Sequence, residues 1–153
     1  MGTDILNLLN KSGLPVGLRN NNPLNLRKTS IKWQDEIVNT GGTGRSNEFE
    51  SFRTLAGGLR AGIKNAKGKF AKGTKTIHSL IHIWAPESDG NNTAAYVATV
   101  AKRAGVAPTS RVEWSNTALI ARIIQAMAIH ESGAVAEKYL PLDFVQEQVR
   151  LVG

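Results

Sequence analysis

Helical spacing of apolar residues dominates the chain from residue 55 onward and constrains its fold more than any other feature. Apolar positions recur every three or four residues in the segments 55–70, 76–84, 93–104, 116–131 and, after Pro141, 142–152. Asn92 and Thr93 can cap the third segment, and Ser115 or Asn116 can cap the fourth. These patterns predict a mainly helical domain.

The first third of the chain predicts a small amount of β-structure after a short helix over 3–10. Residues 31–38 and 48–52 are typical of extended chain, and the turn-rich sequence TGGTGRSN lies between them. Phe49 and Phe52 would anchor this hairpin. With 153 residues and no cysteine, the chain is expected to form one domain, residues 1–153, that packing alone stabilises. The predicted class is mainly α (α+β) with one small β-hairpin.

The charge balance indicates a polyanionic partner. Nineteen Lys and Arg stand against twelve Asp and Glu, for a net charge of +7. Nucleic acid is disfavoured as that partner, because the basic residues are scattered and thinly interleaved with aromatic ones. No apolar run approaches membrane-spanning length, and Asp4 stands where a secretory signal would be basic. We therefore expect no signal peptide and no membrane insertion.

Glu131 is the residue most expected to carry chemistry. Ile120, Ile124, Met127 and Glu131 follow one another at spacings of 4, 3 and 4, so an apolar helix face ends in a carboxyl group. Burial and the C-terminal end of a helix dipole both disfavour an ionised carboxyl group, as a general acid requires. From periodicity alone, the favoured interpretation is a partly exposed Glu at a frayed helix end.

Three motifs resemble segments of lytic transglycosylases and flagellum-type glucosaminidases. The end of AMAIHESG resembles the glutamate-serine motif that closes their catalytic helix, and NNNPLNLR resembles the asparagine-leucine segment that lines their cleft. NNTAAYVATV is similar to the segment whose tyrosine reaches the catalytic glutamate. The resemblance implies Glu131 as general acid and base, Tyr96 as its hydrogen-bonding partner, and Asn25 and Asn92 as substrate-binding residues.

The order of these motifs differs from that of ordinary transglycosylases, in which the glutamate helix comes first. Here Glu131 comes last, so the resemblance implies a circularly permuted lysozyme-like fold. Residues 19–133 also resemble a family of small phage and prophage proteins that are often described as virion structural proteins. Leu24 departs from that family, which usually has Gly at this position.

A second carboxylate would decide between two reactions. A hydrolase with general-acid catalysis needs another acid across the cleft, and Glu48 and Glu50 on the predicted hairpin are candidates. Because they are two residues apart they face the same side of a strand, and two solvated acids are the simpler interpretation. A lytic transglycosylase needs one glutamate, since the acetamido group of the sugar assists. With Tyr96 as partner of Glu131, the sequence favours the transglycosylase.

Trp84 is the aromatic residue expected to stack on a sugar ring, with Trp33 and Trp114 as alternatives. His78 and His82 have a spacing that could hold a metal, but no third ligand is evident, and neither a metal nor a cofactor is expected.

The sequence thus predicts a phage-derived enzyme that cleaves peptidoglycan strands as a lytic transglycosylase, or as a lysozyme-type muramidase if a second carboxylate takes part. The alternative is a virion structural or polyanion-binding protein without turnover. Peptidoglycan is the expected partner, together with other virion proteins. The expected location is the virion, or the host cytoplasm before release to the cell wall.

Overall fold

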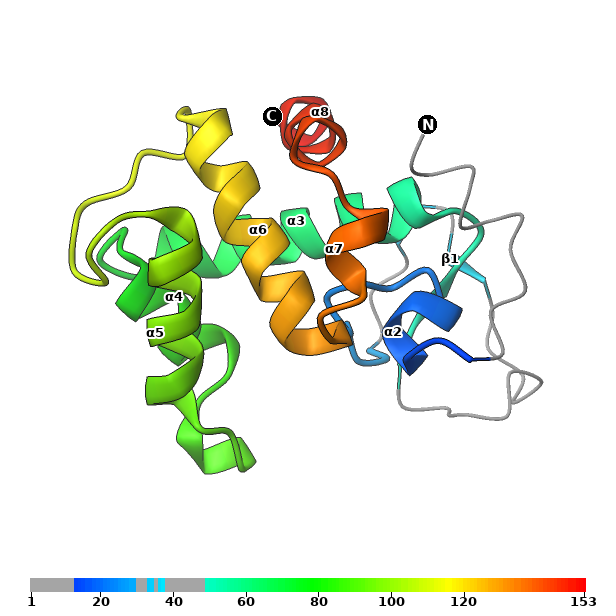
Figure 1. The fold of residues 1–153 in the computed structure, drawn as a ribbon, viewed down its shortest axis with the longest axis horizontal. Helices are drawn as coiled ribbons and strands as arrows, with labels where there is room; N and C mark the ends of the chain where they lie inside the picture. Colours follow the sequence, from blue (N-terminus) through cyan, green and yellow to red (C-terminus); the bar gives the residue numbers. More distant parts are fainter. Residues whose placement is uncertain (1–12, 30–32, 35, 38–48) are drawn as a thin grey trace.

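The structure, a computed structural model, describes residues 13–29, 33–34, 36–37 and 49–153. Within these residues the fold is mainly helical, as the sequence predicts (Figure 1). The helices are α2 (Val16–Arg19), α3 (Leu55–Lys72), α4 (Ile77–Trp84), α5 (Thr93–Ala104), α6 (Thr117–Ser132), α7 (Ala136–Tyr139) and α8 (Leu142–Val152), and a 3-10 turn, η1, spans Glu87–Asp89. The predicted helix over 3–10 lies outside the described residues.

The long helices begin and end close to the predicted positions. The predictions 93–104 and 142–152 coincide with α5 and α8, and the others differ by one or two residues at an end. Asn92 and Asn116 cap α5 and α6, each accepting a hydrogen bond from a backbone N–H three residues on. No helix in the described ranges has both the length and the apolar character needed to cross a membrane.

Helix α6 is the centre of the core. In Figure 1 it runs through the middle of the molecule, with α5 on one side, α7 and α2 on the other, and α3 behind it. The predicted stripe is confirmed, since Ile120, Ile124 and Met127 are fully buried. Burying each such side chain contributes about 1.5–3 kcal/mol to folding. Glu131, one turn further along the same face, is half-buried.

The predicted hairpin is present as a small antiparallel pair. β1 (Glu36–Ile37) pairs with β2 (Ser51–Phe52), and an isolated antiparallel bridge joins Arg27 to Phe49. Residues 38–48, between the two strands, lie outside the part of the chain that the structure describes. The mainly helical class with a small β-component is therefore confirmed.

The asparagine-rich loop after α2 ties this strand pair to the helices. Asn21 Nδ2 donates to Phe52 O at 3.1 Å, and Asn22 Nδ2 donates to Leu26 O at 2.9 Å and to Glu50 O at 3.0 Å. These buried amide groups donate to backbone carbonyl groups that have no hydrogen-bond partner within a helix or strand. Asn21 and Asn22 therefore hold the loop against the strand pair.

Two glycines of α3 let the loop approach the helix. A Cβ on Gly58 would lie 1.6 Å from Asn21 O, and a Cβ on Gly62 would lie 2.3 Å from Leu24 Cδ1. Leu24 is 1% exposed and packs in the main core. Position 24 thus holds a core side chain, and Gly62 provides the space for it.

Candidate active site

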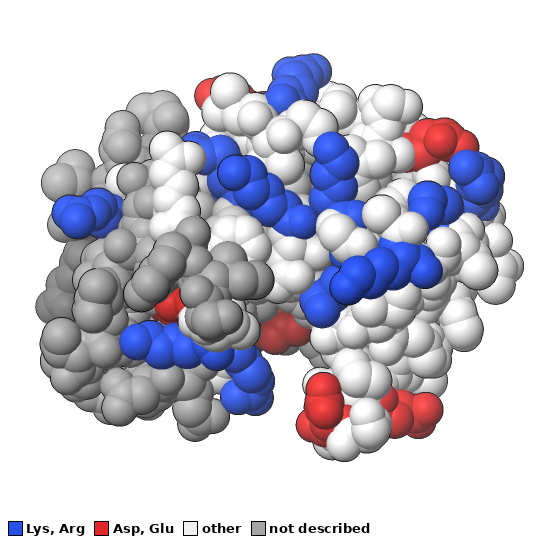
Figure 2. All heavy atoms as spheres, turned by 180° about the vertical axis from the view of Figure 1, so that it is seen from behind, with Lys and Arg blue, Asp and Glu red and all other residues white. Residues whose placement is uncertain are grey.

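Glu131, in the last turn of α6, lines a cleft of about 590 Å³. The volume is within the range of about 300–1,000 Å³ that is typical of small-molecule sites. Figure 2 views the molecule from behind and shows a hollow with an acidic side chain recessed in it and basic side chains on both sides. The other polar side chains that line the cleft come from the loop after α2, from α3 and from the turn around η1; they are Asn25, Arg27, Thr29, Asn65, Lys69, Asp89 and Asn91.

Two donors bind the same oxygen of the Glu131 carboxyl group. The Tyr96 hydroxyl, from α5, donates to Oε2 at 2.9 Å, and the Trp84 indole N–H, at the end of α4, donates to Oε2 at 3.1 Å. No described residue donates to Oε1. One oxygen is therefore held by the protein, and the other remains available to a molecule in the cleft.

Tyr96 is fixed from several sides. Its side chain is 1% exposed, and the His130 ring stacks on it with centroids 3.7 Å apart and an interplanar angle of 22°. Burial, followed by the negative charge of Glu131, raises the pKa of Tyr96 far above its ordinary value. Tyr96 therefore keeps its proton and serves as a hydrogen-bond donor. The structure brings Tyr96 to Glu131 as the resemblance implies, and His130 is exposed.

The loop after α2 also holds the end of α6. Asn25 Nδ2 donates to Glu131 O at 2.8 Å, and Ser132 Oγ donates to Pro23 O at 2.8 Å. The last carbonyl groups of a helix lack partners within the helix, and Asn25 supplies one. Asn25 lines the cleft, but its amide nitrogen is already bound to Glu131. The structure thus shows Asn25 holding the last turn of α6, and the substrate contact that the resemblance implies stays a prediction.

Close approach of α2 makes this contact between loop and helix feasible. A Cβ on Gly17 would lie 2.2 Å from Ser132 Oγ and 2.8 Å from Asn25 Oδ1. Only a glycine at this position of α2 leaves both side chains where they are. The motifs around Asn25 and Glu131, 106 residues apart in sequence, are therefore neighbours in space.

Glu50 of the hairpin does not line the cleft. It is 1% exposed, so the predictions of a solvated acid and of a catalytic carboxylate at this position are wrong for Glu50. The physical reason is that both faces of the strand are covered here, since Ser51 and Phe52 are buried as well as Glu50. Glu48 lies outside the described residues.

Asn92 was expected both to cap a helix and to bind substrate, and the structure shows the cap. Asn92 is exposed and its Oδ1 accepts a hydrogen bond from the Ala95 N–H at 3.1 Å, which caps α5. Asn92 does not line the cleft, whereas its neighbour Asn91 does. The capping role is confirmed, and the position of Asn92 outside the cleft lining does not support the predicted substrate contact.

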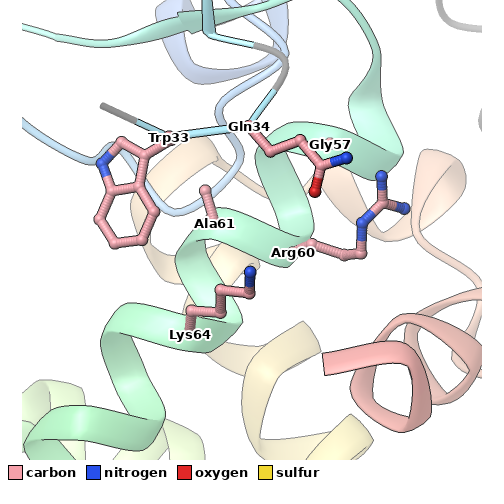
Figure 3. A pocket seen from close by; sticks show the side chains of 6 residues that line it. All are labelled: Trp33, Gln34, Gly57, Arg60, Ala61 and Lys64. Atoms are coloured by element: carbon pink, nitrogen blue, oxygen red, sulfur yellow. The ribbon is translucent and has the colours of Figure 1, made fainter. Parts of the chain in front are cut away.

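Of the tryptophans, Trp84 alone lines the cleft within the described residues. Trp114 packs on Phe70, with ring centroids 5.5 Å apart. Trp33 packs on a small apolar cluster and borders a separate pocket of about 20 Å³, which Figure 3 shows beside Arg60 and Lys64 of α3. A volume of this size holds about one water molecule and no sugar.

The histidine pair of α4 makes a local contact. The rings of His78 and His82 stack with centroids 4.1 Å apart, and His82 Nδ1 lies 2.8 Å from His78 O. Among the residues that the structure describes, no group of three or more His, Asp or Glu side chains is arranged to hold a metal.

The sequence did not single out the cleft residues Asn65, Lys69 and Asp89. Asn65 and Lys69 are four residues apart and share a face of α3. Nothing local separates Lys69 from the other lysines of α3. Its place in the cleft follows from the way α3 packs against distant segments.

Comparison with known proteins finds no family model that matches the chain. Protein P5 of Pseudoalteromonas phage PM2 is 33% identical over 122 residues, which cover 77% of this chain and 71% of that protein. The matched region is long enough to include most of the fold described above. The chain therefore belongs to the family of bacteriophage proteins that includes Protein P5 of Pseudoalteromonas phage PM2.

Proposed function

We propose that the protein cleaves the glycan strands of peptidoglycan as a lytic transglycosylase, with Glu131 as general acid and base. The observation that carries this proposal is the pair of hydrogen bonds from Tyr96 and Trp84 to one oxygen of Glu131 within the cleft. A carboxyl group held in this way keeps its free oxygen at a constant position, which proton transfer to a bound substrate requires.

In the proposed reaction, protonated Glu131 donates through Oε1 to the glycosidic oxygen while the bond from that oxygen to C1 breaks. The acetamido oxygen of the same sugar attacks C1. Glu131, now a carboxylate, takes the proton of the C6 hydroxyl, whose oxygen attacks C1 and displaces the acetamido oxygen. The product then ends in a 1,6-anhydro ring. The donors on Oε2 stabilise the carboxylate between the two proton transfers.

The burial of Glu50 supports the one-glutamate reaction over a hydrolase that uses Glu50. A lysozyme-type hydrolase remains the second candidate on one observation, the presence of Asp89 in the cleft lining. Asp89 is exposed and lies at the end of η1, five residues after Trp84 in the sequence. The products of the reaction separate the two candidates.

A circularly permuted lysozyme-like arrangement is part of the proposal. Its support is the contact between the Asn25 segment and the end of α6, because the resemblance requires these motifs to meet at one cleft. The family relation to a phage protein supports a location in the virion. Action at the bacterial wall, by a virion protein or by one made in the host cytoplasm before release, is part of the proposed reaction. Peptidoglycan and other virion proteins are the proposed partners.

Glu131→Gln tests the catalytic role directly. The substitution keeps the shape of the side chain and should abolish the release of fragments from purified peptidoglycan while leaving the melting temperature within about 2 °C. Mass spectrometry of the fragments from the native protein should show anhydro ends. Reducing ends would overturn the transglycosylase assignment, and a native protein that releases no fragments would favour a virion structural or polyanion-binding role.

A further inference from the structure

We propose that Arg27 and Lys69 form an anion subsite in the cleft that binds a carboxylate group carried by the glycan strand. This inference rests on the proposed function, because it concerns the substrate of the same cleft. It goes beyond the proposed function by stating which class of glycan the cleft prefers, namely a glycan that carries acidic groups over a neutral one.

The two cations come from different parts of the chain. Arg27 follows the asparagine-rich loop, and Lys69 lies near the C-terminal end of α3. Both line the cleft that also holds Glu131. In Figure 2 basic side chains stand on either side of the hollow, whereas a cluster of acidic side chains lies beyond it at the lower edge.

Arg27 is oriented by Phe49. Their backbones form an antiparallel bridge, and the Arg27 guanidinium carbon lies over the Phe49 ring at 5.1 Å from its centroid. A guanidinium group that packs on an aromatic ring loses little further freedom when a ligand binds. Its planar set of N–H donors suits the two oxygens of a carboxylate.

Lys69 is a half-buried cation without a partner among the described residues. No hydrogen bond or ion pair joins its ammonium group to them. Its own helix cannot neutralise it, because α3 has the sequence LAGGLRAGIKNAKGKFAK and contains no acidic residue. Partial burial weakens the hydration of the ammonium group, and a bound anion would restore favourable contacts to it.

The acidic groups of the cleft come from other elements, with Glu131 on α6 and Asp89 in η1. An anion in the cleft is therefore attracted to Arg27 and Lys69 and repelled from Asp89. Peptidoglycan strands carry carboxylate groups on their lactyl-linked peptides, whereas chitin consists of neutral N-acetylglucosamine units. The charge pattern thus favours peptidoglycan over chitin. It also places the carboxylate of the bound strand near Arg27 and Lys69.

The test measures binding without turnover, in the full chain that carries Glu131→Gln. The ligands are insoluble purified peptidoglycan, the same material with its carboxylates converted to methylamides, and chitin. In this background Lys69→Gln should weaken binding to native peptidoglycan about three- to tenfold and leave binding to the other two ligands unchanged. The matched control is Lys72→Gln, an exposed lysine of the same helix that does not line the cleft, which should change none of the three.

The substitution Arg27→Lys is a second, independent test of the subsite. It keeps the charge but removes the planar donor set, so binding to native peptidoglycan should weaken while melting stays unchanged. Arg53→Lys, at an exposed position outside the cleft lining, is its control. Any of three results would overturn the subsite. They are an equal loss of binding on native and amidated peptidoglycan, an equal effect of Lys69→Gln and Lys72→Gln on binding, and the absence of binding to native peptidoglycan.

Failure of the subsite and failure of the proposed reaction give different results. If the protein cleaves amidated strands as fast as native ones, the subsite proposal is wrong and the proposed reaction still stands. If the native protein binds peptidoglycan through its carboxylates but releases no fragments, the proposed reaction is wrong and the subsite proposal still stands. Binding that falls as ionic strength rises only on native strands would further support the subsite.

Discussion

The Tyr96 hydroxyl donates to Oε2 of Glu131 at 2.9 Å, and the two residues are 35 positions apart on adjacent helices. Both ends of this contact are fixed by packing. Tyr96 is fully buried beneath the His130 ring, and Glu131 continues the apolar face of α6. Because burial keeps the phenol protonated, the Tyr96 hydroxyl can donate to Oε2 whenever Glu131 is a carboxylate.

Tyr96→Phe should lower the rate of fragment release from peptidoglycan about 10- to 100-fold, because it removes one of the two donors on Oε2 and keeps the buried ring. The matched control is Tyr139→Phe, which alters another buried tyrosine, on α7, outside the cleft lining. That variant should retain its rate. Full activity of Tyr96→Phe, with fragments measured by chromatography, would show that the hydrogen bond to Glu131 has no part in the reaction.

Trp84→Phe separates positioning of Glu131 from stacking on sugar. Phenylalanine keeps an aromatic face but has no N–H for Oε2, so the rate should fall about tenfold while binding of the Glu131→Gln form to peptidoglycan changes little. Trp114→Phe is the control, since that ring packs on Phe70 away from the cleft. If binding and rate fall in equal proportion, Trp84 acts on the substrate and not through Glu131.

The long helices were predictable because their apolar positions repeat over three or more turns. Helices α2 and α7 have four residues each, too few to show a period, and η1 has three. Within the site, Glu131 could be singled out because the stripe that precedes it is local. Its contact with Tyr96 came from the resemblance, and the second donor on Oε2, Trp84, was expected only to stack on sugar.

Long-range packing decided what the sequence left open. Phe49 and Phe52 lie on opposite faces of a strand, so the sequence alone does not tell which face is buried. In the structure both faces are covered at this point, and Glu50, Ser51 and Phe52 are all buried. Lys69 lies in the cleft because Gly58 and Gly62 set the distance between α3 and the loop. No local pattern carries that information.

Glycines of α3 allow a direct test of this packing. Gly58→Ala should destabilise the protein by about 1–3 kcal/mol, because its Cβ would meet Asn21 O at 1.6 Å and a backbone atom cannot move aside cheaply. Gly68→Ala on the same helix has nothing within 4 Å of its Cβ and should stabilise the protein by about 0.5–1 kcal/mol. Urea unfolding followed by circular dichroism measures both. Similar shifts in the two variants would mean that α3 and the loop are not in close contact.

Asp89→Asn decides whether a second carboxylate takes part in the reaction. Asp89 is exposed in η1, and no described residue forms an ion pair with it. If one glutamate serves as acid and base, Asp89→Asn should change the rate less than about threefold, and the fragments should keep their anhydro ends. The neighbouring Glu87→Gln, outside the cleft lining, controls for the loss of a negative charge in the same turn. A loss of about 10³-fold in Asp89→Asn alone, with reducing ends from the native protein, would instead assign Asp89 as the second carboxylate of a hydrolase.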